Sequence, residues 1–232
     1  MNVRALRVAG ALLVVAVGIW AGLRIFAGHA PGRVAGRPPP VGEAIPPIPS
    51  DFDAPEGPAV PLPKVPERLP TFSLADRTGK PTSIATWRDK SLIINFWATW
   101  CAPCRHEIPL LESLSREWGG RGVEVVGIAV DHRDQVLAYA DELKIAYPLL
   151  IGEQDALDVA AELGFESPVF PFTVFTDRRG EVVTLYVGEL HKAQADLILS
   201  VVQNLNQNRV QLTEARHTIA DGLHALAPQH PG

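Results

Sequence analysis

Two cysteines stand two residues apart in the segment NFWATWCAPCRHEIP, residues 95–109, and the chain of 232 residues has no others. Cys101 and Cys104 could serve as a structural disulfide, as half of a zinc site, or in reversible thiol–disulfide exchange. A disulfide between them would close a loop of only four residues, which the chain-entropy argument values at about 2 kcal/mol. Structural zinc needs four ligands. There is no second cysteine pair, and His106 and His132 are only loose candidates.

The position of the two cysteines favours the exchange chemistry. Cys101 stands where an apolar run, residues 91–97, gives way to a helical pattern. Unpaired N–H groups and the helix dipole favour an anion at such a helix start, so a thiolate becomes available near neutral pH. Cys104 follows one turn later on the same face, within reach of a mixed disulfide at Cys101. Pro103 removes an N–H that the first turn would leave unpaired, and it stiffens the loop. We therefore interpret the pair as redox-active.

The elements that must hold this pair form a strand–helix–strand unit. Residues 91–97 are a continuous apolar run interrupted by Asn95, which is typical of a strand buried on both faces. Residues 102–118 carry apolar side chains at helical spacing, and Gly119 and Gly120 end the pattern. Residues 123–130 read as a second buried strand. This order predicts a right-handed crossover and a parallel pair of strands.

The remaining patterns complete an α/β sandwich. A short hairpin is predicted around residues 76–80, and a turn at 177–180 joins two further strands into a second hairpin. The other predicted strands are 147–151, 172–175 and 182–187, and the other predicted helices are 134–144, 154–163 and 192–205. A last amphipathic helix carries Leu212, Ala215, Ile219, Leu223 and Leu226. The predicted fold class is α/β, a three-layer sandwich with a mixed central sheet that is parallel in its first half.

The N-terminal segment is predicted to be a membrane helix. Residues 8–23 carry no charge, and the apolar stretch extends to residue 27 if Arg24 snorkels toward the headgroups. A cleaved signal peptide is the alternative, because residues 28–30 offer a small-x-small site, although Pro31 follows it directly. Both readings place the rest of the chain outside the cytoplasm.

Composition divides the chain further. Residues 31–70 contain 13 prolines, which predicts a semi-rigid linker without a core. The expected domains are a membrane anchor or signal segment over 1–30, a Pro-rich linker over 31–69, a folded domain over 70–205 and a helical extension over 206–232. The extension is expected to pack against the domain, with partner docking as the alternative. A net charge of −5 gives no basic footprint for nucleic acid.

The segment FWATWCAPC, with Pro109 five residues after Cys104, resembles the active-site segment of the thioredoxin superfamily. The similarity extends to residues 170–173, Phe-Pro-Phe-Thr, and to Asp177 and Gly180 beyond them. Together with the apolar N-terminus, the Pro-rich linker and the extra helix–strand material between residues 134 and 163, the chain resembles the TlpA/ResA-like family. Members of that family are membrane-tethered, extracytoplasmic thiol–disulfide oxidoreductases. The resemblance covers roughly residues 70–205.

The resemblance implies a thioredoxin-like fold with a cis-proline beside the redox pair. Pro171 is favoured over Pro168 for that place, because a Thr-containing strand follows it. Cys101 would be the attacking thiol and Cys104 the resolving one. The residues that the resemblance assigns to substrate binding are Trp100, Ala102, Pro103, Phe170 and Pro171.

Glu107 matches an active-site glutamate of the ResA-like subgroup, which implies a catalytic role in tuning the thiols. The alternative is a solvated acid in the first helical turn, stabilised by the dipole. Asn95 departs from thioredoxins proper, which carry a buried Asp at this position. That departure makes Glu107 the more plausible proton-handling group. Trp97 is expected to be a core residue.

The expected function is that of an extracytoplasmic thiol–disulfide oxidoreductase, a reductase of protein disulfides, with roles in redox homeostasis and in cytochrome c or copper-protein maturation implied by resemblance. A thiol peroxidase-like redoxin and a copper chaperone of similar fold are alternatives, but the only methionine is Met1. No metal site and no cofactor are predicted. The expected partners are disulfide-containing proteins and a membrane thiol–disulfide electron donor. The expected location is the periplasmic side of the inner membrane, or the soluble periplasm after signal cleavage.

Overall fold

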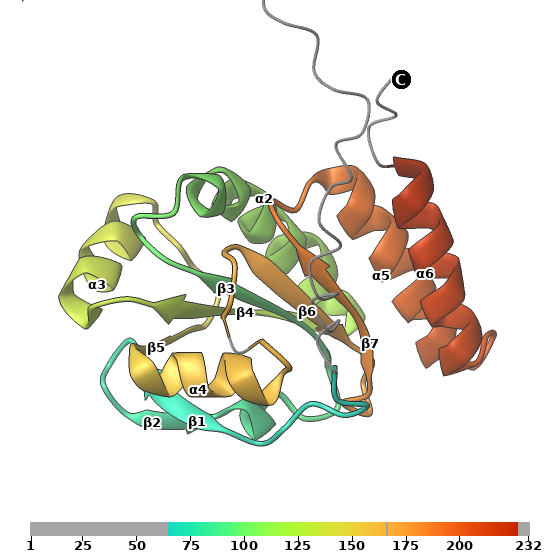
Figure 1. Ribbon diagram of the computed structural model, residues 1–232, viewed down its shortest axis with the longest axis horizontal. Coiled ribbons are helices and arrows are strands. Elements are labelled where there is room, and N and C mark those ends of the chain that lie inside the picture. The colour runs from blue at the N-terminus through green and yellow to red at the C-terminus, as the bar shows by residue number, and fades with distance from the viewer. Residues whose placement is uncertain (1–64, 166, 227–232) are drawn as a thin grey trace, which may run out of the picture. The chain divides into compact units, whose positions relative to one another are not determined.

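The computed structural model describes residues 65–165 and 167–226 (Figure 1). The expected membrane segment over 1–30 lies outside the described residues, as does the linker up to residue 64. In the two described ranges, no helix is both long enough and apolar enough to span a membrane.

The described residues form seven strands, five α-helices and two short 3₁₀ helices. The strands are β1 (Ser73–Asp76), β2 (Pro81–Ser83), β3 (Ser91–Trp97), β4 (Val123–Val130), β5 (Leu149–Gly152), β6 (Phe172–Thr176) and β7 (Val182–Val187). The α-helices are α2 (Ala102–Trp118), α3 (Arg133–Glu142), α4 (Gln154–Glu162), α5 (Lys192–Asn206) and α6 (Leu212–Leu226). The 3₁₀ helices are η1 (Ile84–Trp87) and η2 (Gly119–Arg121).

All seven strands belong to one mixed sheet in the order β2-β1-β5-β4-β3-β6-β7. The central strands β3, β4 and β5 run parallel, and every other neighbouring pair is antiparallel. The predicted crossover from β3 through α2 to β4 is present, and so is the hairpin of β6 and β7. The α/β class and the mixed sheet are therefore confirmed.

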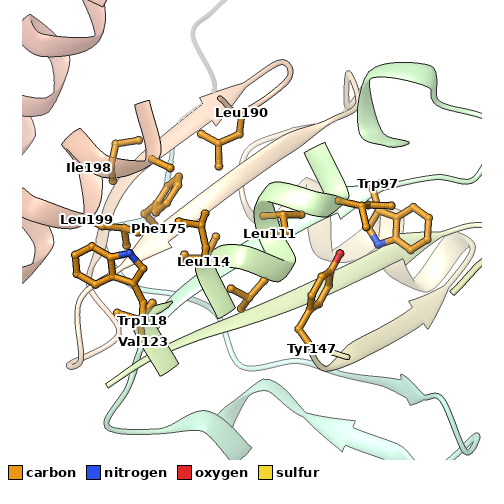
Figure 2. Close-up of a cluster of buried hydrophobic side chains, with 14 of the residues drawn as sticks. Trp97, Leu111, Leu114, Trp118, Val123, Tyr147, Phe175, Leu190, Ile198 and Leu199 are labelled. Atoms are coloured by element: carbon orange, nitrogen blue, oxygen red, sulfur yellow. The ribbon is translucent and has the colours of Figure 1, made fainter. Parts of the chain in front are cut away.

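Helices cover both faces of the sheet because side chains alternate along each strand. Ile93 and Val125 point into a core cluster with Leu111 of α2, and Ile198 of α5 belongs to the same cluster. Figure 2 shows part of this cluster, with Leu111 among its labelled residues. The neighbouring strand residues point the other way, and α4 covers that second face (Figure 1).

The strand β5 begins two residues later than the pattern predicts. The backbone before β5 is hydrogen-bonded to Glu112 of α2 instead of to a neighbouring strand. The Oε1 atom of Glu112 accepts the N–H groups of Ala146 at 2.6 Å and Tyr147 at 3.4 Å. Pro148, which follows, has no N–H to donate to a ladder. The preceding helix α3 ends at Glu142, and Lys144 adopts a positive φ of 56° beyond it. A side-chain hydrogen bond from a distant helix thus sets where this strand starts.

The C-terminal helix α6 packs against α5 and the sheet-edge strand β7 (Figure 1). Ala215 and Ile219 on its inner face are buried. The Nη2 and Nε atoms of Arg216 donate to the carbonyl of Val182 in β7, at 2.6 and 3.2 Å. Gly222 fits closely, because a Cβ there would lie 2.6 Å from Leu197 Cδ2. The helical extension is therefore part of the folded unit.

Residues at the start of the described chain form hydrogen bonds at the same edge of the sheet. The N–H of Val182 donates to the carbonyl of Glu67 at 2.9 Å, and the N–H of Leu69 donates to the carbonyl of Gly180 at 2.9 Å. The outward N–H and C=O of Val182 are thus bonded by the two terminal segments of the described chain. These bonds occupy the outward backbone groups of the first residue of this edge strand, which are then not free to pair with another molecule.

Replacing Ile219 by alanine is expected to lower the free energy of unfolding by roughly 2–4 kcal/mol, because the side chain is buried and its loss leaves a cavity. Urea denaturation measures the effect. Thr218→Ala, at the exposed neighbouring position, is the matched control and is expected to change stability by less than about 0.5 kcal/mol. A loss of the same size in both variants would contradict the packing of α6 described above.

Candidate active site

Cys101 and Cys104 form a disulfide at the start of α2, with 2.00 Å between the sulfurs and 5.3 Å between the Cα atoms. Cys101 is the N-cap residue, in extended conformation, and its Sγ accepts the N–H of Cys104 at 3.3 Å. Its own N–H donates to the carbonyl of Ala98 at 3.2 Å. Cys101 is 5% exposed and Cys104 is fully buried. The cysteine with the greater exposure is therefore also the one at the positive end of the helix.

The local sequence explains this arrangement. β3 is buried along its whole length and ends at Trp97, which is fully buried as expected for a core residue. Pro103 follows at the second helical position, where a missing N–H costs nothing. Ala102 and Pro103 are both exposed on the turn between the cysteines. Nothing bulky or charged thus stands on the turn that separates the two sulfurs.

A second loop supplies the residues expected beside the redox pair. The peptide bond between Phe170 and Pro171 is cis, and no other cis bond occurs in the described ranges. Pro171 is the cis-proline that the sequence favours over Pro168. Its carbonyl accepts the N–H of Gly188, after β7, at 2.8 Å. The loop is thus held at the end of the β6–β7 hairpin.

Aromatic side chains connect this loop to the cysteine segment. Trp100 is 67% exposed, and its ring meets the half-buried ring of Phe170 edge-on at 6.0 Å between centroids. Phe170 in turn stacks on Phe172 of β6 at 6.1 Å. Val169, which the sequence does not single out, is 65% exposed at the same loop. Exposed apolar side chains therefore flank the residues Cys101 and Pro171.

Glu107 lies inside the domain at 1% exposure, so the alternative of a solvated surface acid is wrong. Its Oε1 accepts a hydrogen bond from Asn95 Nδ2 of β3 at 2.7 Å. Its Oε2 accepts the N–H of Leu190, between β7 and α5, at 2.9 Å. Asn95 Nδ2 also donates to Thr173 Oγ1 of β6 at 3.0 Å. The carboxyl thus connects α2 to the strands on which the cis-proline loop is built.

Burial raises the pKa of Glu107 from its ordinary 4.5 to about 7. The hydrogen bonds from Leu190 and Asn95 act in the opposite direction, because they stabilise the carboxylate. The negative charge of Glu189 raises the pKa further. Glu107 can therefore hold or release a proton near neutral pH, as a proton-transfer group requires.

The histidines weighed as zinc candidates have acidic partners of their own. His106 Nδ1 lies 3.5 Å from Glu189 Oε2, and His132 Nδ1 lies 3.0 Å from Glu153 Oε2. In residues 65–165 and 167–226, no group of three or more His, Cys, Asp or Glu side chains is arranged to hold a metal ion.

Glu107 should make the stability of the oxidised protein depend on pH. The unfolded chain releases this proton near pH 4.5 and the folded chain near pH 7, so the folded state binds more protons between these values. The free energy of unfolding should therefore fall as pH rises across this window, by about 3 kcal/mol relative to Glu107→Gln. Urea denaturation at several pH values measures the difference. Glu117→Gln, on the exposed side of α2, is the control; a Glu107→Gln curve parallel to wild type would contradict the raised pKa.

Residues 65–197 match the AhpC/TSA family. The thioredoxin-like protein YneN of Bacillus subtilis (strain 168) is 32% identical over 134 residues, which cover 56% of this chain and 75% of that protein. The thiol–disulfide oxidoreductase ResA of Geobacillus kaustophilus (strain HTA426) is 29% identical over 135 residues, with 58% and 75% covered. Among solved structures, a thioredoxin-family thiol:disulfide interchange protein from Chlorobium tepidum TLS superposes with a TM-score of 0.54 and 33% identity, over 60% of this chain and 97% of that one.

These matches agree with the resemblance carried by the CAPC segment and the proline loop. The Chlorobium tepidum structure shares the thioredoxin-like fold, and both its description and that of ResA name thiol–disulfide chemistry. The chain belongs to the AhpC/TSA family of thioredoxin-like proteins and is similar to its ResA-type thiol–disulfide oxidoreductases.

Proposed function

We propose that this protein is an extracytoplasmic thiol–disulfide oxidoreductase that reduces disulfides in other proteins. One observation carries the proposal: the Cys101–Cys104 disulfide lies at the N-terminus of α2, with Cys101 slightly exposed at 5% and Cys104 fully buried. A purely structural bridge of this short span contributes little stability. A reversible couple needs one reachable sulfur and one protected sulfur, as in this arrangement.

The reaction has two exchange steps, in which two electrons pass from the enzyme dithiol to the substrate. The Cys101 thiolate attacks one sulfur of the substrate disulfide. A mixed disulfide forms, the substrate S–S bond breaks, and the released thiolate takes up a proton. The Cys104 sulfur then attacks Cys101 Sγ, which closes the Cys101–Cys104 disulfide and releases the second substrate thiol. A dithiol donor in the membrane reduces the enzyme again.

The order of attack follows from exposure and from the helix. The Cys101 sulfur accepts a hydrogen bond from the N–H of Cys104. It lies at the N-terminal end of α2, where partial positive charge is concentrated. A negative charge on sulfur is stabilised there, and thiolate is the attacking form. Cys104 is fully buried within the helix, so a protein substrate cannot reach it first.

Glu107 is the proposed proton acceptor for the resolving step. It follows Cys104 by three residues on α2, so the two side chains share a face of the helix. The Cys104 thiol must lose its proton before it can attack Cys101. With a pKa of about 7, the Glu107 carboxylate is available to take this proton near neutral pH and can pass it on afterwards.

The proposed substrate surface is the rim of the disulfide. Trp100 and Phe170 offer apolar contacts on one side, and Ala102 and Pro103 are small and exposed on the other. The backbone next to Pro171 is the proposed pairing edge for an extended stretch of substrate around its cysteine. An unfolded or flexible substrate segment fits such a rim better than a rigid folded surface does.

The proposed location is the periplasmic side of the inner membrane, with residues 1–30 as anchor and residues 31–69 as spacer. The uncharged run over residues 8–23 supports this proposal. Release into the periplasm after signal cleavage is the alternative. Cysteine pairs awaiting haem or copper in secreted proteins are proposed substrates, since such pairs must be reduced before they react.

The proposed roles of the two cysteines are tested by trapping. Cys104→Ser should hold substrates as stable mixed disulfides through Cys101, because no thiol remains to resolve them. Cys101→Ser should hold almost none, since Cys104 is buried. Non-reducing electrophoresis after exposure to oxidised insulin or to an extracytoplasmic extract reads out the adducts.

The double variant with both serines is the control for non-specific adducts. Equal trapping by the two single variants, or trapping only by Cys101→Ser, would overturn the assignment of the nucleophile. Wild-type protein that consumes peroxide but leaves insulin oxidised would overturn the proposed reaction itself.

A further inference from the structure

Asp131, the residue after β4, reaches across to the segment that carries Cys101. It is 9% exposed, and its Oδ2 accepts the N–H of Thr99 at 3.1 Å and also the Thr99 hydroxyl. Its Oδ1 accepts the N–H of His132 at 2.8 Å. Its own N–H donates to the carbonyl of Gly152, at the end of β5, at 3.1 Å. One residue thus connects the carboxyl ends of β3, β4 and β5.

The position of this contact follows from the sheet register. Trp97 of β3 pairs with Ala129 of β4, and Thr99 and Asp131 each stand two residues further along. β3 ends at Trp97, two residues before Thr99, so the Thr99 N–H has no acceptor in the β3–β4 ladder. The Asp131 carboxylate supplies the missing acceptor. Such an N–H must find a partner when it is removed from water.

The bonded peptide is the one that leads into the nucleophile. Only Trp100 separates Thr99 from Cys101. The N–H of Cys101 returns to the carbonyl of Ala98 at 3.2 Å, so residues 98–101 form a closed turn. Asp131 holds this turn from outside at Thr99. Rotation of the Thr99 peptide would move Cys101 away from the N-cap position of α2.

The surroundings of Asp131 favour positioning over ion pairing. Within the described residues, no Lys, Arg or His side chain forms an ion pair with it. Two of its three acceptor contacts go to Thr99, and the third goes to the adjacent His132. A carboxyl group with so little exposure needs hydrogen-bond partners, and N–H and O–H donors supply them. Those donors belong to the active-site turn and to the start of the α3 segment.

We propose that Asp131, through its hydrogen bonds to Thr99, is a positioning residue that holds Cys101 at the start of α2 for attack. This inference rests on the proposed function in that Cys101 is taken as the nucleophile. It adds a requirement that the motif CAPC does not contain. The helix-capping position of Cys101 depends on a residue 30 positions later in the chain, where the α3–β5 segment begins.

The test compares Asp131→Asn and Thr99→Val with two matched controls in the full-length protein. Thr99→Ser keeps the hydroxyl, and Asp134→Asn removes an exposed acid from the same segment. The first readout is the rate of iodoacetamide alkylation of Cys101 in the reduced protein as a function of pH. The second is kcat/KM for insulin reduction, and circular dichroism checks the fold.

Asp131→Asn and Thr99→Val are expected to lower the alkylation rate at pH 7 and kcat/KM by about tenfold, because the first replaces an acceptor oxygen of Asp131 by an amide group and the second removes the Thr99 hydroxyl donor. Thr99→Ser and Asp134→Asn are expected to stay within about twofold of wild type. The proposal is overturned if the first two variants only melt earlier and keep the wild-type alkylation profile. It is also overturned if Asp134→Asn matches Asp131→Asn, because the effect would then be one of charge.

The two proposals fail in different ways. Wild-type protein that does not reduce insulin contradicts the proposed function, whereas alkylation of Cys101 needs no substrate and still tests the positioning role. If Asp131→Asn does not fold, Thr99→Val alone tests the positioning role. The valine keeps the shape of the side chain and the backbone N–H and removes only the hydroxyl donor.

Discussion

The buried carboxyl of Glu107 links the active-site helix to the sheet, and the geometry of the thiols depends on it. Asn95 of β3 and the Leu190 N–H after β7 donate to its two oxygens. A carboxyl group buried without such donors would cost several kcal/mol, so these bonds fix the start of α2 relative to the strands. The same burial raises the pKa of Glu107 to about 7. The interaction that anchors the helix therefore also gives this carboxyl group a pKa at which it can gain or lose a proton near neutral pH.

The two cysteines occupy the turn that this anchor holds in place. Cys101 lies at the helix end, and Cys104 faces inward on the side of α2 that also carries Glu107. Asn95 stands where thioredoxins proper carry an acid, and it donates to the acid on the neighbouring helix. The ionisable carboxyl group therefore belongs to the helix instead of the strand. It is buried three residues after Cys104, and Asn95 also donates to Thr173 of β6.

The sequence predicts β3, α2, β4 and β7 at their observed bounds. Continuous apolar runs indicate β3 and β4, and apolar residues at helical spacing indicate α2, because such patterns follow from burial. The full strand order could not be read in this way, because the pairing of β1 with β5 joins residues far apart in the chain. Pro171 was predictable only through resemblance. Glu107 is ambiguous in the sequence, because a glutamate near the start of a helix is usually solvated. Asp131 gave no signal, since an acid after a strand is common and only the register brings it to Thr99.

The reduction potential of the Cys101–Cys104 couple tests most directly the claim that the protein is a reductase. Cys104 is fully buried and Glu107 follows it on the same face of α2, and both features disfavour a thiolate at Cys104. The reduced form therefore lacks the stabilisation that ionisation of Cys104 would give it, which lowers the reduction potential. Equilibration with glutathione or dithiothreitol at pH 7, read by mass spectrometry, gives the value. The account predicts a potential of about −270 mV or lower, comparable with reducing thioredoxins. A potential near about −120 mV, which is characteristic of strong oxidants, would contradict it.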